Sequence, residues 1–374
     1  MILKFASFFI WAFVTFNLFY KSGASLALKI AGSALILVIS AKYYIYEILG
    51  GAFFCPDLPR SFIILMECLY GSLIILFFLL LLFDIYLAGN WIIARAGMPV
   101  PQKLPTGWIR IGLACLALGV GVWATWESVS IPRVRRVSIS IPKLPSALEN
   151  FKIVQLTDLH VGPILDGAWL DGVVRKVNAL APDIVVITGD FIDGHVDKVL
   201  DELAPLADLQ SRYGVFGVTG NHEYYWNAAE WTRAIRSLNV RMLENEHEII
   251  NIKGEELVVA GIPDLAAQGF GQEPPDLDKA LAGAPEAVRL LLAHQPKLAR
   301  EYSSKVDVHL AGHTHGGIIF FLRPLIARFN NGFVGGLYDV NASNLYVSPG
   351  TGIWNGFSFR LGVPAEITEI ILKP

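Results

Sequence analysis

Long apolar segments fill the first third of this 374-residue chain, and they constrain its fold more than any other feature. Each of them comes near the ~20 residues that a helix needs to cross the hydrocarbon core of a bilayer. Most charged residues and prolines lie after about residue 131. The chain is therefore predicted to be a membrane region followed by a globular domain. The four segments are Met1–Tyr20, Ile30–Phe54, Phe62–Ile93 and Ile111–Ser128.

The first and third segments are the most clearly apolar. Phe62 to Leu82 carries only Glu67 among charged residues, whereas the second segment contains Lys42 and Glu47. A Lys42 side chain that extends to the membrane interface beside neighbouring tyrosines would reconcile the second segment with a spanning helix. We expect the first segment to be a retained anchor and not a cleaved signal peptide, because its apolar run exceeds the roughly 7 to 15 residues of a signal core.

Four spans would place both chain ends on the same side of the bilayer. Five basic residues flank the spans on each side, so the positive-inside rule gives no orientation. The cluster Arg133–Arg136 directly after the last segment, read as membrane-flanking charge, leans towards a cytoplasmic domain. We expect a multi-pass protein of the cell membrane, with the side of its globular domain left open. The charges compared are Lys4, Arg60, Arg133, Arg135 and Arg136 against Lys21, Lys29, Arg95, Lys103 and Arg110.

The second part of the chain alternates short apolar strands with amphipathic helices. Strand-like runs at Phe151–Leu156, Asp183–Thr188 and Tyr213–Thr219 are separated by segments with helical spacing. This alternation predicts an α/β domain with a mostly parallel sheet. Further strands after residue 249 suit a sandwich of two sheets flanked by helices. The predicted domains are a transmembrane region with four helices at 1–131, a linker with an edge strand at 132–150, and the α/β domain at 151–374.

Charge and cysteine content exclude some partners. The formal net charge is −3. No basic stripe interleaved with aromatic residues runs through the second half, so no nucleic-acid partner is expected. Cys55, Cys68 and Cys115 all fall in the membrane region, so the globular domain has no disulfide and no thiolate metal ligand. No protein partner is indicated.

Five short motifs rich in aspartate, histidine and asparagine follow predicted strands. Ligands of open α/β sheets gather beyond the carboxyl ends of the strands, so these motifs are expected to converge at one edge. Residues two apart in an extended chain face the same way, so Asp158 and His160 can point at one centre, as can His313 and His315. The motifs are Asp158-Leu159-His160, Gly189-Asp190-Phe191-Ile192-Asp193, Gly220-Asn221-His222-Glu223, His294 and Gly312-His313-Thr314-His315.

The ligand types in these motifs limit the metal. Carboxylate, imidazole and amide groups without thiolate suit Mn, Fe or Zn, and so many imidazoles argue against Mg or Ca. Two such ions ~3.5–4 Å apart, bridged by a shared carboxylate, form a clamp for in-line attack at phosphorus. The motifs together therefore predict a two-metal site for phosphate chemistry.

Taken singly, some of these residues have plainer explanations. Asp158 and Asp193 could be turn or capping residues. Glu223 could support the ligands from behind or lie at a solvated helix start. Two further histidines, His247 and His309, fall outside the motifs, as does His195, and all three are expected to be surface residues or hydrogen-bonded core residues.

The motif series resembles that of the calcineurin-like metallophosphoesterase superfamily, whose pattern is Asp-x-His, Gly-Asp-x-x-Asp, Gly-Asn-His-Asp/Glu, His and Gly-His-x-His. Every element is present in order between Asp158 and His315. The stretches Tyr346–Gly350 and Pro364–Ile367 also resemble the membrane-anchored bacterial branch of that family. The resemblance covers roughly residues 151–374 and implies the family's two-sheet sandwich flanked by helices.

The resemblance also implies roles for individual residues. Asp190 would bridge two ions, and His222, oriented by Asp193, would donate a proton or hydrogen bond to the ester. The attacking group would be a metal-bound hydroxide, and Asn221 and Arg360 would contact the substrate. The implied ligands are Asp158, His160, Asp190 and His315 for one ion, and Asp190, Asn221, His294 and His313 for the other.

Two classes of function follow. The first is a membrane-anchored metal-dependent hydrolase of a phosphodiester, phosphomonoester or pyrophosphate. The second is a non-catalytic membrane sensor or scaffold that keeps the metal fold as structure. Asp190 and His222, which a degenerate member should lose first, are both present, so the enzyme is favoured. Its phosphorylated substrate could be lipid-linked, or the helices could only hold a general phosphodiesterase at the lipid bilayer.

Overall fold

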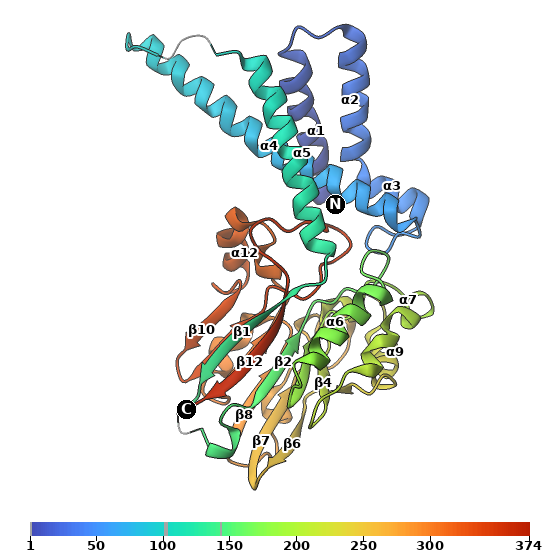
Figure 1. The fold of residues 1–374 in the computed structure, drawn as a ribbon, viewed down its shortest axis with the longest axis vertical. Helices are drawn as coiled ribbons and strands as arrows, with labels where there is room; N and C mark the ends of the chain where they lie inside the picture. Colours follow the sequence, from blue (N-terminus) through green and yellow to red (C-terminus); the bar gives the residue numbers. More distant parts are fainter. Residues whose placement is uncertain (1, 101–103, 143) are drawn as a thin grey trace. The chain divides into compact units, whose positions relative to one another are not determined.

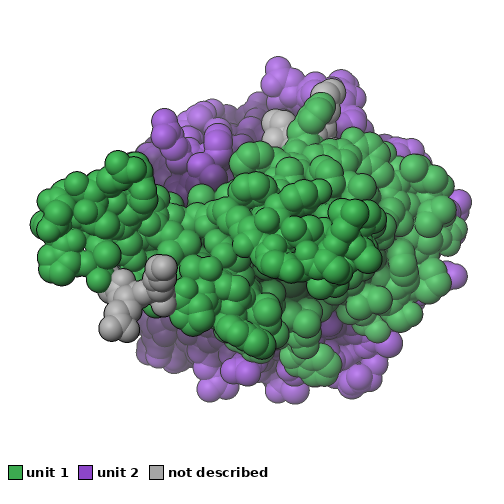
Figure 2. Space-filling view, turned by 90° about the horizontal axis from the view of Figure 1, so that it is seen from above, with its two compact units in different colours: residues 1–126, 356–359 green, residues 127–355, 360–374 purple. Residues whose placement is uncertain are grey.

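The computed structural model describes residues 2–100, 104–142 and 144–374, and the chain divides into two compact units. The first unit comprises Met1–Trp126 together with Gly356–Phe359, and the second comprises Glu127–Asn355 and Arg360–Pro374 (Figure 2). The chain thus leaves the second unit at Asn355 and returns to it at Arg360. Two residues named in the sequence predictions, Met1 and Lys103, lie outside the described residues.

Apolar helices build the first unit (Figure 1). Among the described residues, α4 (Arg60–Arg95) and α5 (Thr106–Val129) are each long and apolar enough to cross a membrane. The helices α2 (Leu26–Ser40) and α3 (Lys42–Gly50) would make a third span if this pair, bent by 63°, is counted as one. Helix α1 (Ile2–Thr15) continues as a π-helical turn at Phe16–Tyr20 and is a shorter apolar helix.

The helices differ from the predicted spans in three respects. The first span, predicted to be among the clearest, forms one of the shorter helices, and the fourth begins at Thr106 instead of Ile111. The second is broken after Ser40. The prediction that Lys42 extends to the interface is wrong, because its side chain is fully buried and its ammonium lies 2.9 Å from the Glu67 carboxylate in α4. A buried charge needs such an opposite charge beside it.

Two six-stranded sheets form the second unit, with strand orders β1-β12-β2-β3-β4-β5 and β10-β11-β9-β8-β7-β6. Neighbouring strands run parallel from β2 to β5 and from β7 through β8 and β9 to β11, as predicted. The strands are β1 (Arg133–Ser140), β2 (Lys152–Leu156), β3 (Ile184–Thr188), β4 (Val215–Val218), β5 (Arg241–Met242), β6 (Glu246–Ile252), β7 (Glu255–Gly261), β8 (Val288–Leu292), β9 (Val308–Ala311), β10 (Gly336–Val340), β11 (Ser343–Val347) and β12 (Glu366–Lys373).

The inner faces of both sheets make one core. Ile184 and Val186 of β3 and Leu290 and Leu292 of β8 belong to the same buried cluster, because alternate residues of a strand share a face. The whole of β3 is buried. That explains its continuous apolar run, since a strand covered on both faces needs no polar alternation.

Helices of the second unit follow the strands in the sequence, and α6, α7 and α9 are labelled near one sheet in Figure 1. Helix α6 begins after Asp166, whose side chain accepts a hydrogen bond from the Trp169 amide at 3.0 Å and so caps the helix. The α-helices of this unit are α6 (Gly167–Ala179), α7 (Val196–Leu203), α8 (Asn221–Tyr225), α9 (Ala228–Arg236), α10 (Leu277–Ala280), α11 (Ala299–Tyr302) and α12 (Arg323–Phe329).

The basic cluster predicted to flank the membrane belongs to the edge strand β1, which begins at Arg133 and pairs in parallel with β12. Arg135 lies 3.5 Å from Glu366, and Arg136 forms an ion pair with Glu369. Both glutamates are buried, so these arginines neutralise carboxylates of the sheet. These arginines therefore have a structural role in the sheet. This role weakens the argument that their charge places the domain in the cytoplasm.

His309 in β9 differs from its prediction as a surface or hydrogen-bonded residue. It is buried, and neither ring nitrogen has a hydrogen-bond partner within the described part of the chain. Burial lowers the pKa of His309 to about 3, so its imidazole is neutral in the folded protein. An unpaired buried polar ring is destabilising.

We expect His309→Leu to stabilise the protein by ~1 kcal/mol, because it removes buried groups that have no partner. Unfolded histidine binds a proton below about pH 6.5, whereas folded His309 does so only near pH 3. Wild-type stability should therefore fall as the pH falls below about 6.5, and the advantage of the variant should widen. Thermal unfolding in detergent at about pH 7.5 and about pH 5.5 measures this.

His247→Leu is the matched control for this comparison. His247 lies in β6, and its Nδ1 is 2.7 Å from the Ala280 carbonyl oxygen, so its replacement loses a hydrogen bond. The control should destabilise the protein. An equal gain in both variants, or a gain at His309 that is independent of pH, would contradict the explanation.

Candidate metal centre

The predicted motif residues follow strands of both sheets. Asp158 and Asp190 come directly after β2 and β3, and Asn221 follows β4. His294 and His313 follow β8 and β9 of the other sheet. Parallel strands present their carboxyl ends at one edge, and the structure brings these side chains together there, at the distances given below.

The backbone turns sharply at the candidate ligands. The left-handed region is unfavourable for residues other than glycine and persists only where the surroundings enforce it. Glycine allows a close approach nearby, since a Cβ at Gly220 would lie 2.2 Å from Asp190 Oδ1. The non-glycine residues with positive φ in the motifs are Asp158 (52°), His160 (47°), Asp190 (54°), His313 (70°) and His315 (47°).

Asp158, His160 and His315 form a first group that could hold a metal ion, with potential ligand atoms within 4.8 Å of one another. His315 Nε2 lies 3.4 Å from Asp158 Oδ1 and 3.2 Å from His160 Nε2. Asp190 Oδ2 lies 3.7 Å from His160 Nε2. All four residues are buried, so their polar atoms converge on a centre shielded from bulk water.

Asp190, His294 and His313 form a second such group. His294 Nε2 lies 3.0 Å from Asp190 Oδ2 and 3.2 Å from His313 Nδ1. The Asn221 amide oxygen is buried and has no hydrogen-bond partner among the described residues. Asn221 directly precedes His222, whose backbone amide donates a hydrogen bond to Asp190 Oδ1 at 2.9 Å. An unpaired buried acceptor beside carboxylate and imidazole groups fits a cation ligand.

Hydrogen bonds orient the candidate ligands. His294 Nδ1 donates to the Thr188 carbonyl oxygen at 2.8 Å, which leaves its Nε2 available for a metal. His160 uses Nδ1 in the same way towards Asp193 Oδ1, at 3.2 Å. Asp158 accepts from the His313 amide at 3.0 Å. Burial lowers the pKa of His313 to about 3, which keeps its ring neutral as a metal ligand must be.

Glu223 supports the ligands from behind, the first of its two predicted roles. It is fully buried and accepts from the amides of Asp190, Phe191 and Gly220 at 3.1, 2.8 and 2.6 Å. Burial and the Asp190 charge raise the pKa of Glu223 to about 7, although these bonds oppose the shift. The side chain fixes the loop that carries Asp190.

His222 lies between these groups and Asp193. Its Nε2 is 4.0 Å from Asp190 Oδ2, and its Nδ1 is hydrogen-bonded to Asp193 Oδ1. Burial lowers the pKa of His222, but the charges of Asp190 and Asp193 outweigh burial and raise the pKa to about 9. Cations bound at Asp190 would offset part of that charge and bring this pKa back towards neutrality.

Asp193, His160 and His222 also lie close enough together to hold an ion. We assign Asp193 to hydrogen bonding instead, because both of its oxygens already accept bonds from the protein. Its Oδ2 accepts from the Asn355 backbone amide at 2.9 Å and from the Asn355 side-chain amide at 3.0 Å. Burial raises the pKa of Asp193, but the two imidazoles outweigh this and hold it below its usual range. Asn355 lies outside every motif and could not be predicted from the sequence.

Arg360, predicted as a phosphate contact, lies beside a candidate metal ligand, with its Nη2 3.5 Å from His315 Nδ1. Its side chain is fully buried. The guanidinium Nη2 donates to the carbonyl oxygens of Pro349 and Gly352 at 2.8 and 2.7 Å. These bonds stabilise the loop after β11, and the contact of Arg360 with a phosphate stays a prediction.

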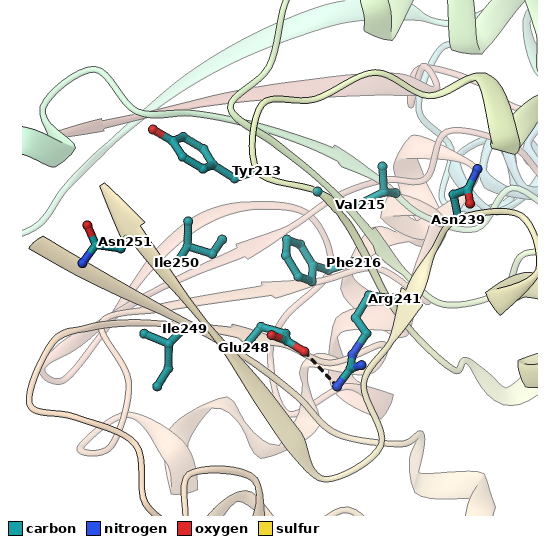
Figure 3. Close-up of a pocket in the computed structure, with 10 residues that line it drawn as sticks. Tyr213, Val215, Phe216, Asn239, Arg241, Glu248, Ile249, Ile250 and Asn251 are labelled. Atoms are coloured by element: carbon teal, nitrogen blue, oxygen red, sulfur yellow. Dashed lines mark ion pairs between the residues drawn. The ribbon is translucent and has the colours of Figure 1, made fainter. Parts of the chain in front are cut away.

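A separate pocket of about 450 Å³ lies along β4 and β6 (Figure 3). Its lining includes Phe216, Arg241 and Glu248, the last two joined by an ion pair of 2.8 Å. None of the candidate metal ligands lines this pocket. We therefore assign metal binding to the candidate ligands and not to this pocket.

Several known proteins are similar to this chain. Residues 151–317 match the family model for calcineurin-like phosphoesterases. A transmembrane protein with metallophosphoesterase domain from Bos taurus is 34% identical over 98% of this chain and 86% of its own length. Its Danio rerio namesake is 33% identical over 86% and 76%. A metallophosphoesterase of Campylobacter jejuni is 39% identical over 66% of this chain and 65% of its own length.

Two points follow from these relatives. The branch predicted to be bacterial has animal members as well. The Bos taurus relative aligns along nearly the whole chain, so the likeness extends to the helical unit.

The predicted sandwich of two sheets with flanking helices is confirmed, and the protein is a metal-dependent phosphoesterase. The chain belongs to the calcineurin-like metallophosphoesterase family.

Proposed function

We propose that this protein is a membrane-anchored hydrolase that uses two divalent metal ions to cleave phosphoester bonds. The observation that carries the proposal is the position of one carboxylate oxygen, Asp190 Oδ2. It lies 3.0 Å from His294 Nε2 in one ligand group and 3.7 Å from His160 Nε2 near the other. A single carboxylate shared in this way is what a pair of ions ~3.5–4 Å apart requires.

The ligand set suits Mn, Fe or Zn, because it combines carboxylate, imidazole and amide groups. When bound, the ions would lower the pKa of water and offset the charge of the phosphate, so that attack proceeds at neutral pH. Asp158, His160 and His315 would hold one ion, Asn221, His294 and His313 the other, and Asp190 both.

His222 would protonate the departing oxygen of the ester. Its Nδ1 is hydrogen-bonded to Asp193 Oδ1, and its Nε2 lies 4.0 Å from Asp190 Oδ2, on the side where a substrate would bind. The Asp193 carboxylate would fix the ring and stabilise its charged form, as carboxylates do behind other catalytic histidines. Asn221 keeps its predicted second role as a contact to the substrate.

The experiment uses full-length protein in detergent, loaded with Mn, and a panel of bis-p-nitrophenyl phosphate, p-nitrophenyl phosphate and a lipid pyrophosphate. We expect hydrolysis that a chelator abolishes and Mn restores. Preference for the lipid pyrophosphate would support a lipid-linked substrate, whereas equal rates would support a general phosphoesterase held at the bilayer. Bound metal without hydrolysis of any ester would favour the alternative, a non-catalytic sensor or scaffold.

The proposal includes a multi-pass topology in the cell membrane, and this gives a further prediction. With four crossings, reporters fused before the first helix and after Pro374 must report the same compartment. Two of the four segments are not single long spans, since α1 is a shorter apolar helix and α2 and α3 are separated by a 63° bend. Reporters in opposite compartments would show that an odd number of segments cross.

A further inference from the structure

The short segment Gly356–Phe359 belongs to the helical unit, although the residues before and after it belong to the other unit. Lys42 Nζ donates to the Gly356 carbonyl oxygen at 3.0 Å. The Ser358 amide donates to Glu67 Oε2 at 2.9 Å. Each charged side chain therefore holds one backbone group of the segment.

Lys42 and Glu67 form a fully buried ion pair, with the ammonium 2.9 Å from both carboxylate oxygens. Tyr46 adds a hydrogen bond to Glu67 Oε1 at 3.0 Å. Two buried charges are tolerated only when further hydrogen bonds satisfy their remaining donors and acceptors. The segment supplies one carbonyl and one amide for this purpose, so the ion pair and the segment stabilise each other.

Helix α4 also carries a glycine where the segment packs against it. The Phe359 side chain is fully buried. A Cβ added at Gly71 would lie 2.2 Å from a ring carbon of Phe359, far inside contact distance. The Phe357 ring lies 6.2 Å from the Tyr70 ring, centroid to centroid. The ring of Phe359 therefore requires the absence of a side chain at Gly71.

The residues on both sides of the segment are tied to the candidate metal centre. Asn355 donates two hydrogen bonds to Asp193 Oδ2, and Asp193 Oδ1 holds His222. Arg360 donates to the Gly352 carbonyl oxygen at 2.7 Å, and the Gly352 amide donates to the Asp158 carbonyl oxygen at 3.0 Å. Gly356–Phe359, which lies between Asn355 and Arg360 in the sequence, is the segment that the helical unit holds.

We infer that Lys42, Glu67 and Gly71 are positioning residues for ester hydrolysis: by holding Gly356–Phe359 they fix Asn355, and through it Asp193 and the His222 ring. The helices then do more than anchor the enzyme. The effect on rate rests on the proposed function, whereas the effect on the loop does not. A displacement of about 1 Å at a catalytic group can cost ~100-fold in rate, so a distant support of this kind is expected to matter.

Two alanine substitutions in the same helix test the inference. Gly71→Ala pushes a methyl group into the Phe359 ring and removes no charge, and alanine favours the helix. Gly89→Ala is the matched control, because nothing lies within 4 Å of a Cβ there. In the Mn-loaded full-length protein, Gly71→Ala should lower kcat ~10–100-fold for an alkyl phosphodiester. It should lower kcat less for bis-p-nitrophenyl phosphate, with KM and metal content unchanged.

Amide hydrogen exchange gives a readout that is independent of activity. Exchange at Asn355 and Ser358 should be faster in Gly71→Ala than in the wild type, and unchanged in Gly89→Ala. The double variant Lys42→Met with Glu67→Met removes both charges together, so neither is left unpaired, and should accelerate the same amides. This second variant tests the inference if Gly71→Ala does not fold.

Each outcome decides the inference. Faster exchange with a selective loss on the alkyl ester supports it. Unchanged exchange in both variants, or faster exchange with full activity on the alkyl ester, overturns it. If the wild type cleaves no ester, the proposed function fails, and the Asn355 amide alone then shows whether the helices hold the partner of Asp193.

Discussion

Replacing Asp190 with asparagine is expected to remove most activity and most bound metal. Its Oδ2 lies in one ligand group, 3.0 Å from His294, and 3.7 Å from His160 of the other. Losing the shared charge should weaken the binding of both ions. Each ion supplies several kcal/mol of transition-state stabilisation. We expect kcat to fall on the order of 1000-fold or more. Elemental analysis and steady-state kinetics on the same preparation measure both effects.

Asp193→Asn is the matched comparison for Asp190→Asn, because it removes a neighbouring buried carboxylate by the same change. Asp193 reaches a ligand only through the ring of His160, at 3.2 Å. Loss of such a supporting carboxylate typically costs ~10–100-fold in metal affinity, so saturating Mn should restore occupancy. If metal content were equal in the wild type and the Asp190 variant, the bridging assignment would be wrong.

Replacing His222 with asparagine should separate catalysis from metal binding. Both ions should remain bound, because the candidate ligands lie on other residues, and kcat should fall by ~10²–10⁴-fold through loss of a proton donor. The loss should be larger for alkyl phosphodiesters. A p-nitrophenolate departs with little help, whereas an alkoxide requires a proton. Kinetics with both kinds of leaving group, together with metal analysis, measure the effect.

His195→Asn controls for the loss of an imidazole as such. His195 is exposed, and its ring lies against Trp226, 4.7 Å between centroids, so its replacement should leave kcat unchanged. Loss of an ion from the His222 variant would make His222 a ligand. An equal loss of rate for good and poor leaving groups would make it a phosphate anchor and not an acid.

The residues of the metal centre could be predicted because each is local to a strand end. Asp158, Asp190 and His313 follow short apolar runs in the sequence, and the parallel order of their strands brings them together. Of the pairs two residues apart, Asp158 and His160 share one ligand group as predicted, whereas His313 and His315 belong to different groups. The strands themselves differ from their predicted ends by a few residues, because helix and strand ends are set by packing and caps as well as by local pattern.

The supports of this centre could not be predicted, because they depend on contacts between distant parts of the chain. Asn355 meets Asp193 across 162 positions, and Lys42 meets Gly356 across 314. Neither pair is marked in a single sequence by a periodic pattern or by a motif of fixed spacing. Arg360 is suggested as a phosphate contact by the family resemblance alone, and its burial against backbone carbonyls is likewise not visible in the sequence.

The reading of Lys42 as an interfacial residue failed for the same reason. A lone lysine in an apolar segment can extend to the membrane surface or pair with a buried acid. The acid is Glu67, in a different helix. Tyr43 and Tyr46, two of the neighbouring tyrosines that suggested an interface, instead lie beside the ion pair, with the Lys42 ammonium 4.6 and 5.7 Å from their rings. Only the fold decides between the two.

The most direct test of the two-metal assignment is a titration of metal-free full-length protein with Mn. Bound Mn and hydrolysis of bis-p-nitrophenyl phosphate are measured at each step. Activity should be absent without metal and should saturate when about two ions are bound per chain. Activity that persists without metal, or that saturates at about one ion per chain, would contradict a binuclear centre bridged by Asp190.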